Sequence, residues 1–195
     1  SCDPDNASHF FKQYQLGFIE NGKSVEITSD GGFIITGEYW RTDVDSDILV
    51  CKFDYQGNEE WRKKYAITAS FQTGSSIKET TSDGGFIVVG SSKEFHNTKR
   101  SIILIKTYSD GNPEWIKYFD EGNTDTWGFS LIQTVDGGYM ISGSSQSFAN
   151  YQTLIIKTDS YGEKIWSKTY DGTGGVFIQK TFDGGYIIVG SKLEQ

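Results

Sequence analysis

Short apolar and β-branched runs alternate with polar, glycine-containing turns along the whole chain. Four segments read Asp-Gly-Gly, an aromatic residue and an apolar stretch that ends in glycine, at 30–37, 83–90, 136–143 and 183–190. Asp-Gly-Gly between strand-forming runs is typical of a tight hairpin turn, because glycine adopts positive φ without steric cost. The pattern predicts one β-strand before each turn and one after it.

Two further motifs recur in the same order. An aromatic-x-Lys-x-aromatic run starts at Phe10, Trp61, Trp115 and Trp166, and an apolar run ending in lysine reads DILVCK, SIILIK and QTLIIK. Turns rich in Asp, Asn and Gly separate the two motifs. One period of roughly fifty residues therefore predicts four short antiparallel strands with a long loop between the second and the third. The second period has one extra residue, which we interpret as a bulge in its first strand.

Four strands in about fifty residues are typical of a β-propeller blade. A lone blade buries too little surface to be stable, so it must stack on its neighbours. We predict an all-β fold, a β-propeller of about four four-stranded antiparallel blades, with Trp61, Trp115 and Trp166 packed between them. The expected organisation is a flexible tether at 1–9 and one domain at 10–195, with repeats at about 24–65, 75–119, 128–170 and 176–190 plus 10–14.

Closure of this propeller leaves two alternatives open. The N-terminal strand at 10–14 is expected to close the last blade, but one third-position strand is missing after residue 190. A ring with one defective blade is the first interpretation. A partial arc of a larger propeller, or one completed by a second chain, is the other.

Composition and charge narrow the classes of partner. Aromatic residues make up 15% of the 195 residues, there are 23 glycines, and the formal net charge is −8. Aromatics and glycines favour strands and tight turns. The acidic balance argues against binding to nucleic acid or to an anionic membrane surface, since both favour basic proteins. No run of 18 apolar residues occurs, so no transmembrane segment is predicted.

The two cysteines have different interpretations. Cys51 lies in the apolar run DILVCKF and is expected in the core. Cys2 precedes the polar stretch DPDNAS, which resembles the processed end of a bacterial lipoprotein, where a lipid-anchored cysteine heads a flexible tether. An ordinary chain terminus is the alternative interpretation of Cys2.

No catalytic, metal or cofactor site is predicted. The only histidines are His9 and His96, so neither nucleophilic catalysis nor a His/Cys metal site has support. The aspartates of the four Asp-Gly-Gly segments are expected to stabilise turns. Asp43, Asp45 and Asp47 have the spacing of a calcium loop, but Ile48 stands where that loop needs glycine.

The Asp-Gly-Gly repeats, together with the LIIKTDSYGEKIWSKTY and SLIQTVDGG stretches, resemble repeats of bacterial and archaeal cell-surface propeller proteins and lipoproteins. The resemblance covers about residues 10–190. More distantly, the chain resembles quinoprotein-like (PQQ-type) propellers, but nothing in it matches the residues that hold the quinone and its metal. The resemblance implies an extracytoplasmic location, at a bacterial outer membrane, at the cell surface or in the periplasm, and frequently a role in binding a protein or a sugar.

Recognition is expected on the edge that carries the long, variable loops. These loops contain aromatic residues outside the repeat pattern, Phe71 among them, although the rings can also fold inward over the strands. The predicted ligand-binding residues are Tyr39, Trp40, Arg41, Phe95, His96, Trp127, Phe148 and Tyr151. The predicted function is a non-enzymatic scaffold that binds a glycan or an envelope protein; the alternative is a polysaccharide hydrolase or lyase acting from the same edge.

Overall fold

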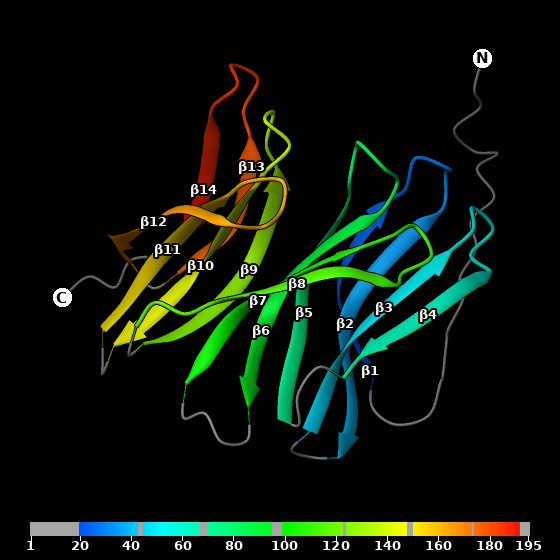
Figure 1. Ribbon diagram of the computed structural model, residues 1–195, viewed down its shortest axis with the longest axis horizontal. Coiled ribbons are helices and arrows are strands. Elements are labelled where there is room, and N and C mark those ends of the chain that lie inside the picture. The colour runs from blue at the N-terminus through cyan, green and yellow to red at the C-terminus, as the bar shows by residue number, and fades with distance from the viewer. Residues whose placement is uncertain are drawn as a thin grey trace.

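The computed structural model describes residues 20–42, 45–66, 70–94, 99–122, 124–147, 150–172 and 174–191. Within these ranges the chain forms fourteen β-strands and no helix, so the predicted all-β class is confirmed. Three successive groups of four strands pair antiparallel in chain order, and we call each group a meander. A two-stranded terminal hairpin follows them (Figure 1).

The strand bounds are as follows. The first meander consists of β1 (Glu20–Ile27), β2 (Phe33–Thr42), β3 (Asp45–Phe53) and β4 (Glu59–Tyr65). The second meander consists of β5 (Ser70–Glu79), β6 (Phe86–Glu94), β7 (Arg100–Thr107) and β8 (Pro113–Phe119). The third meander consists of β9 (Asp125–Gln133), β10 (Tyr139–Ser147), β11 (Asn150–Thr158) and β12 (Lys164–Asp171). The terminal hairpin consists of β13 (Gly175–Lys180) and β14 (Tyr186–Gly190).

The predicted four-bladed propeller is wrong. The described strands form three sheets of eight, four and two strands, and these sheets neither curl nor close into a ring. The first two meanders join into one sheet because β3 and β5 pair in parallel at Ser46 and Phe71, and the Ser46 hydroxyl donates to the Gln72 carbonyl at 2.8 Å. At the other end only two strands are present, and they leave Ile187 53% exposed. The strand predicted at 10–14 lies outside the described residues.

The four Asp-Gly-Gly turns share the hydrogen bonds around the aspartate and the second glycine, and the turn of the second meander is one residue longer than the other three. In each turn a threonine N–H donates to the carbonyl of the second glycine, and the first glycine has φ between 64 and 83°. The aspartate accepts hydrogen bonds from the threonine hydroxyl and from the second glycine N–H. The predicted hairpin turns, and the turn-stabilising role of their aspartates, are confirmed.

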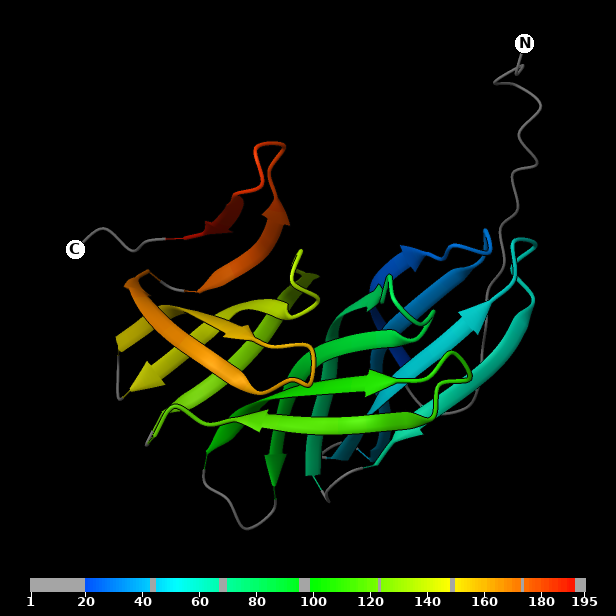
Figure 2. The same ribbon diagram turned by 45° about the horizontal axis from the view of Figure 1, so that its top comes forward.

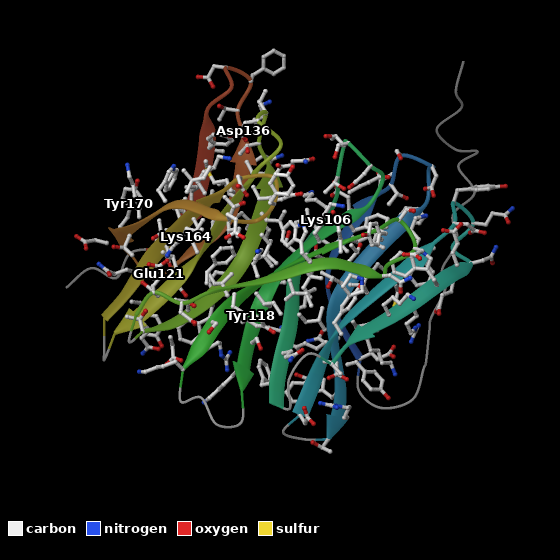
Figure 3. All side chains as sticks on the ribbon, viewed as in Figure 1. Lys106, Tyr118, Glu121, Asp136, Lys164 and Tyr170 are labelled. Atoms are coloured by element: carbon white, nitrogen blue, oxygen red, sulfur yellow. The ribbon has the colours of Figure 1, made fainter. Side chains whose placement is uncertain are left out.

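Three of these turns also hold a buried lysine. The lysine that ends each apolar run binds the turn aspartate, at 2.8 Å for Lys52 and Asp30, 2.7 Å for Lys106 and Asp83, and 2.9 Å for Lys157 and Asp136. The three lysine side chains are only 5 to 10% exposed, and a buried ammonium group requires such partners. Figure 3 shows Asp136 at the edge of the molecule where the turns gather. These lysines therefore tie the third strand of each meander to the turn between its first two strands.

The extra residue of the second repeat lies in a turn and does not create the bulge. The pairing of the first strand with the second shows a register shift in all four repeats, at β1, β5, β9 and β13. The bulge is therefore common to the four repeats and does not come from the extra residue. The Thr80 N–H reaches over one more residue, to the Gly85 carbonyl, than the Thr28 N–H, which reaches Gly32. The extra residue, predicted in the first strand, therefore lies in the turn that follows it.

Apolar side chains from neighbouring meanders form two cores. The core between the first and second meanders contains Ile34, Ile48, Val50, Tyr65, Ile77, Phe86, Val88, Ile103 and Ile105. The core between the second and third meanders contains Ile87, Val89, Ile102, Leu104, Phe119, Leu131, Tyr139, Ile141, Leu154 and Ile156. The second meander is thus apolar on both faces, because alternate residues of each strand point to opposite sides.

Two of the three repeat tryptophans pack as predicted. Trp61 and Trp115 lie against these cores, and a β-carbon at Gly111 or Gly162 would lie 2.7 or 2.6 Å from their respective indole rings. Each ring therefore packs on a glycine turn of the next meander. Trp166 is 37% exposed, since among the described residues no third strand and turn follow the terminal hairpin.

Candidate functional site

The best candidate site is a groove where the inner strands of the three meanders meet. It has a volume of about 350 Å³ and is lined by side chains of β1, β2, β5, β6, β7, β9 and β13. Its aromatic lining comes from Phe71, Trp127, Phe129 and Phe177. A groove of this volume, apolar with a few polar groups, is of the size that holds a small ligand or one or two sugar units.

Five side chains form a continuous row, which we call the aromatic row, and its three central members, Phe71, Arg100 and Trp127, line this groove. The Trp40 ring meets the edge of Phe71 at 5.3 Å between centroids. The Arg100 guanidinium lies over both Phe71, at 4.8 Å, and Trp127, at 5.5 Å. Trp127 then contacts Tyr151 at 6.3 Å. The aromatic row is therefore Trp40, Phe71, Arg100, Trp127 and Tyr151.

The topology brings the aromatic row together from five strands. Phe71, Arg100, Trp127 and Tyr151 stand at or near the starts of β5, β7, β9 and β11, and Trp40 stands near the end of β2. These strand ends all lie on the edge opposite the Asp-Gly-Gly turns (Figure 1). The row therefore crosses all three meanders at the edge that carries the long loops.

The charges in the groove are partly buried. Burial lowers the pKa of Arg100, and the negative charges of Asp125 and Glu38 oppose that shift. Asp125 fixes the start of β7, because its carboxylate accepts the Arg100 backbone N–H at 2.6 Å. Within the described chain, no carboxylate forms a salt bridge with the Arg100 guanidinium. The guanidinium therefore contacts two aromatic rings and lines the groove.

Glu38 is the acidic group of the groove. Burial raises its pKa, but the Lys23 ammonium and the Trp40 indole N–H, with the nearby Thr73 hydroxyl, outweigh burial and lower the pKa below its usual value of 4.5. The Lys23 ammonium lies 3.0 Å from Glu38, and the Trp40 indole N–H donates to the same carboxylate at 3.2 Å. Glu38 is thus ionised at neutral pH and serves as a hydrogen-bond acceptor that orients Trp40.

The structure brings together three of the eight predicted ligand-binding residues, namely Trp40, Trp127 and Tyr151. Tyr39 points to the opposite face of β2, where the Lys64 ammonium lies 3.2 Å from its ring centroid. Arg41 binds Asp45 at 2.8 Å and Asp47 at 3.2 Å, so its charge is neutralised by its own hairpin. The predicted residues Phe95, His96 and Phe148 lie outside the described residues.

Sequence reasoning missed Arg100, Glu38 and Lys23. No motif marks them, and Glu38 directly follows the repeated glycine of its segment. The available signal for Arg100 was its place at the start of the apolar run SIILIK, next to a predicted long loop. Its two ring partners come from β5 and β9, and that convergence depends on tertiary packing.

A second cavity, of about 290 Å³, lies between β8 and the turn that joins β11 to β12. Its charges are paired: Lys117 binds Glu163 at 2.5 Å, and Lys164 binds Glu121 at 3.0 Å. Figure 3 shows Lys164 and Glu121 close together at this contact. These ion pairs connect the second and third meanders, so the second cavity has a structural role.

The remaining chemistry-bearing groups have structural explanations. Across the described ranges, no group of three or more His, Cys, Asp or Glu side chains is arranged to hold a metal ion. Cys51 is buried, as predicted, and burial raises the pKa of its thiol to about 12. In the part of the chain that the structure describes, no helix is long and apolar enough to cross a membrane.

Comparison with protein-family models and with curated proteins finds no match to this chain.

Proposed function

We propose that this chain is a non-catalytic binding protein that holds a glycan along the aromatic row. The observation that carries the proposal is the unbroken contact from Trp40 through Arg100 to Tyr151. Rings of this kind offer flat apolar faces to the C–H faces of sugars, and the guanidinium between them offers N–H donors to sugar oxygens. The groove also has serine hydroxyls along one side, at Ser75, Ser76 and Ser91.

The charge of Glu38 favours binding over hydrolysis. Glycoside hydrolysis usually needs two carboxyl groups, one of them protonated so that it can act as an acid. Glu38 is the only carboxylate among the described residues that line the groove, and its lowered pKa keeps it ionised. An assay for new reducing ends on a panel of polysaccharides separates the two functions, because turnover would support the enzyme.

A glycan panel with matched variants tests the proposal. Trp127→Ala removes one ring of the aromatic row, and we expect about tenfold weaker glycan binding, equivalent to about 1.4 kcal/mol. The matched control is Tyr161→Ala, because Tyr161 is 73% exposed in the turn between β11 and β12 and does not line the groove. Binding should be measured by calorimetry, after melting curves show both variants folded.

Two results would contradict this function. Equal affinities of the two variants for every glycan that binds would remove the aromatic row from the site. Binding to an envelope protein with no glycan bound at all would instead support a protein-recognition role for the same edge.

An extracytoplasmic location belongs to the same proposal. It is supported by the resemblance of the Asp-Gly-Gly repeats to those of bacterial and archaeal cell-surface proteins. Fractionation of a bacterial host that expresses the protein from its full gene is expected to place it outside the cytoplasm, and recovery in the cytoplasmic fraction would contradict this location.

A further inference from the structure

Three contacts that are made in the other repeats are not made at the terminal hairpin and the adjoining end of the third meander, among the described residues. First, Asp183 lies in a turn with the same hydrogen bonds as those of the first and third meanders, with Gly184 at φ 83° and the Thr181 N–H bonded to the Gly185 carbonyl. The other three turn aspartates each bind a buried lysine. Among the described residues, Asp183 has no such lysine, although its Thr181 and Gly185 hydrogen bonds are in place. The turn is therefore formed without the cation that its counterparts hold.

Second, the space beside Gly185 is open where its counterparts are filled. A β-carbon at Gly32, Gly85 or Gly138 would lie 2.1 to 2.2 Å from the carbonyl oxygen of the residue after the buried lysine. At Gly185 a β-carbon would meet only the turn's own Thr181 and Asp183 oxygens, at 3.0 and 3.3 Å. No described strand fills the place that a backbone strand fills in the three meanders.

Third, no described turn covers Trp166 in the last strand of the third meander, whereas a turn of the next meander covers Trp61 and Trp115. Lys63 binds Asn112 at 3.0 Å and Lys117 binds Glu163 at 2.5 Å, in each case one residue after the glycine on which Trp61 or Trp115 packs. Their counterpart Lys168 lies over its neighbouring ring, Trp166, at 5.6 Å from the centroid. Trp166 itself is 37% exposed.

The outer edge of β14 lies between these contacts. In each complete meander the second strand pairs with the first strand on one edge and with the third on the other. Among the described strands β14 pairs only with β13, and Figure 2 shows no strand along its outer side. Ile187 and Val189 of this strand are 53 and 59% exposed, so one face of β14 is uncovered as well. An apolar, unpaired edge of this kind is a template for an added strand.

We propose that the outer edge of β14 binds an extended segment of another protein by strand addition. The segment that fits has an apolar run ending in lysine, then an Asp/Asn-Gly turn, then an acidic or amide residue. Its lysine binds Asp183, its turn glycine covers Trp166, and its last residue binds Lys168. The three runs of this type within the described chain are already buried in their own sheets, with Lys52, Lys106 and Lys157 paired. The described part of a second folded copy therefore has none to donate.

A synthetic peptide with the sequence of residues 150–163 serves as the probe, because it contains the whole pattern from the apolar run to Glu163. Anisotropy of the labelled peptide should show saturable binding to the full chain. Asp183→Lys should weaken binding at least fivefold, since it places two cations together. A peptide with Lys157→Glu should restore binding to Asp183→Lys and bind the unchanged protein poorly.

The matched control is Asp110→Lys, which reverses a charge in an exposed turn of the second meander. It should leave peptide affinity unchanged. The proposal is overturned if neither peptide binds, if Asp183→Lys and Asp110→Lys weaken binding equally, or if light scattering shows that the chain covers this edge by dimerising. These results are independent of glycan binding, because neither variant touches the aromatic row.

Discussion

The second meander (β5–β8) is covered on both faces, whereas in the described part of the terminal hairpin (β13–β14) Ile178 is buried and every residue of β14 is exposed. Both contain an Asp-Gly-Gly turn in which the second glycine N–H donates to the aspartate and a threonine N–H donates to the second glycine carbonyl, although the second-meander turn is one residue longer. In the second meander Ile87, Val88, Ile103 and Leu104 are fully buried, but in the hairpin Ile187 and Val189 are more than half exposed. The local turn is therefore set by its own residues, and burial is set by the neighbours that the fold supplies.

This difference separates two sources of stability. Hydrogen bonds within a turn form wherever the short sequence occurs. The larger gain comes from removing apolar side chains from water, and it requires a second layer. Equivalent substitutions in the second meander and in the terminal hairpin therefore separate the contribution of turn hydrogen bonds from that of apolar burial.

The largest expected difference between the two regions concerns their apolar side chains. Leu104 is 0% exposed in the core between the second and third meanders, so Leu104→Ala should lower the free energy of unfolding by about 3 kcal/mol. Ile187→Ala, at a position that is 53% exposed, should cost only about 0.5 kcal/mol. Urea unfolding followed by tryptophan fluorescence measures both. Equal losses would mean that the hairpin is covered as well as the second meander is.

A smaller difference is expected at the second glycine of the turns. Gly85→Ala places a β-carbon 2.1 Å from the Thr107 carbonyl oxygen, which requires the strand to move and should cost about 2–3 kcal/mol. Gly185→Ala meets only oxygens of its own turn, at 3.0 Å or more, so its cost should stay below about 1 kcal/mol. The same urea experiment compares them, and a Gly185→Ala loss as large as that of Gly85→Ala would show that a strand already lies beside β14.

The strands and their turns could be predicted from the sequence because the information is local. Asp-Gly-Gly between β-rich runs specifies both the turn and the two strands beside it, and the lysine-ended runs form the third strands as expected. The arrangement of the sheets could not be predicted in this way. A parallel bridge between Ser46 and Phe71 depends on how two meanders meet, and no repeat pattern encodes that contact.

The candidate site was predictable only in part, for the same reason. Trp40, Trp127 and Tyr151 are large aromatic residues outside the repeat, so composition alone marks them. Tyr39 is adjacent to Trp40, but successive residues of a strand point to opposite faces, which sends it away from the groove. Arg100 could be recognised only after packing placed it between two rings from distant strands.

The smallest expected difference is electrostatic and depends on pH. Thr134 and Lys157 lower the pKa of Asp136 to about 2, from its usual 3.8. A carboxyl group whose pKa is lowered in the folded state stabilises the fold above its unfolded pKa, and that stabilisation is lost as the pH falls through the folded value. Asp136→Asn should therefore cost about 1 kcal/mol at pH 7, a modest amount because the Asp136 side chain is 61% exposed.

The terminal hairpin provides the comparison for this effect. The pKa of Asp183 is also lowered, by the Thr181 hydroxyl and the Gly185 N–H, but without a lysine. The free energy of unfolding should be measured by urea unfolding between pH 2 and 7. The decrease of this free energy on acidification should be reduced more by Asp136→Asn than by Asp183→Asn. Equal effects of the two variants on this pH dependence would contradict the prediction. The ion pair between the buried lysine and the turn aspartate would then add no stability beyond the hydrogen bonds within the turn.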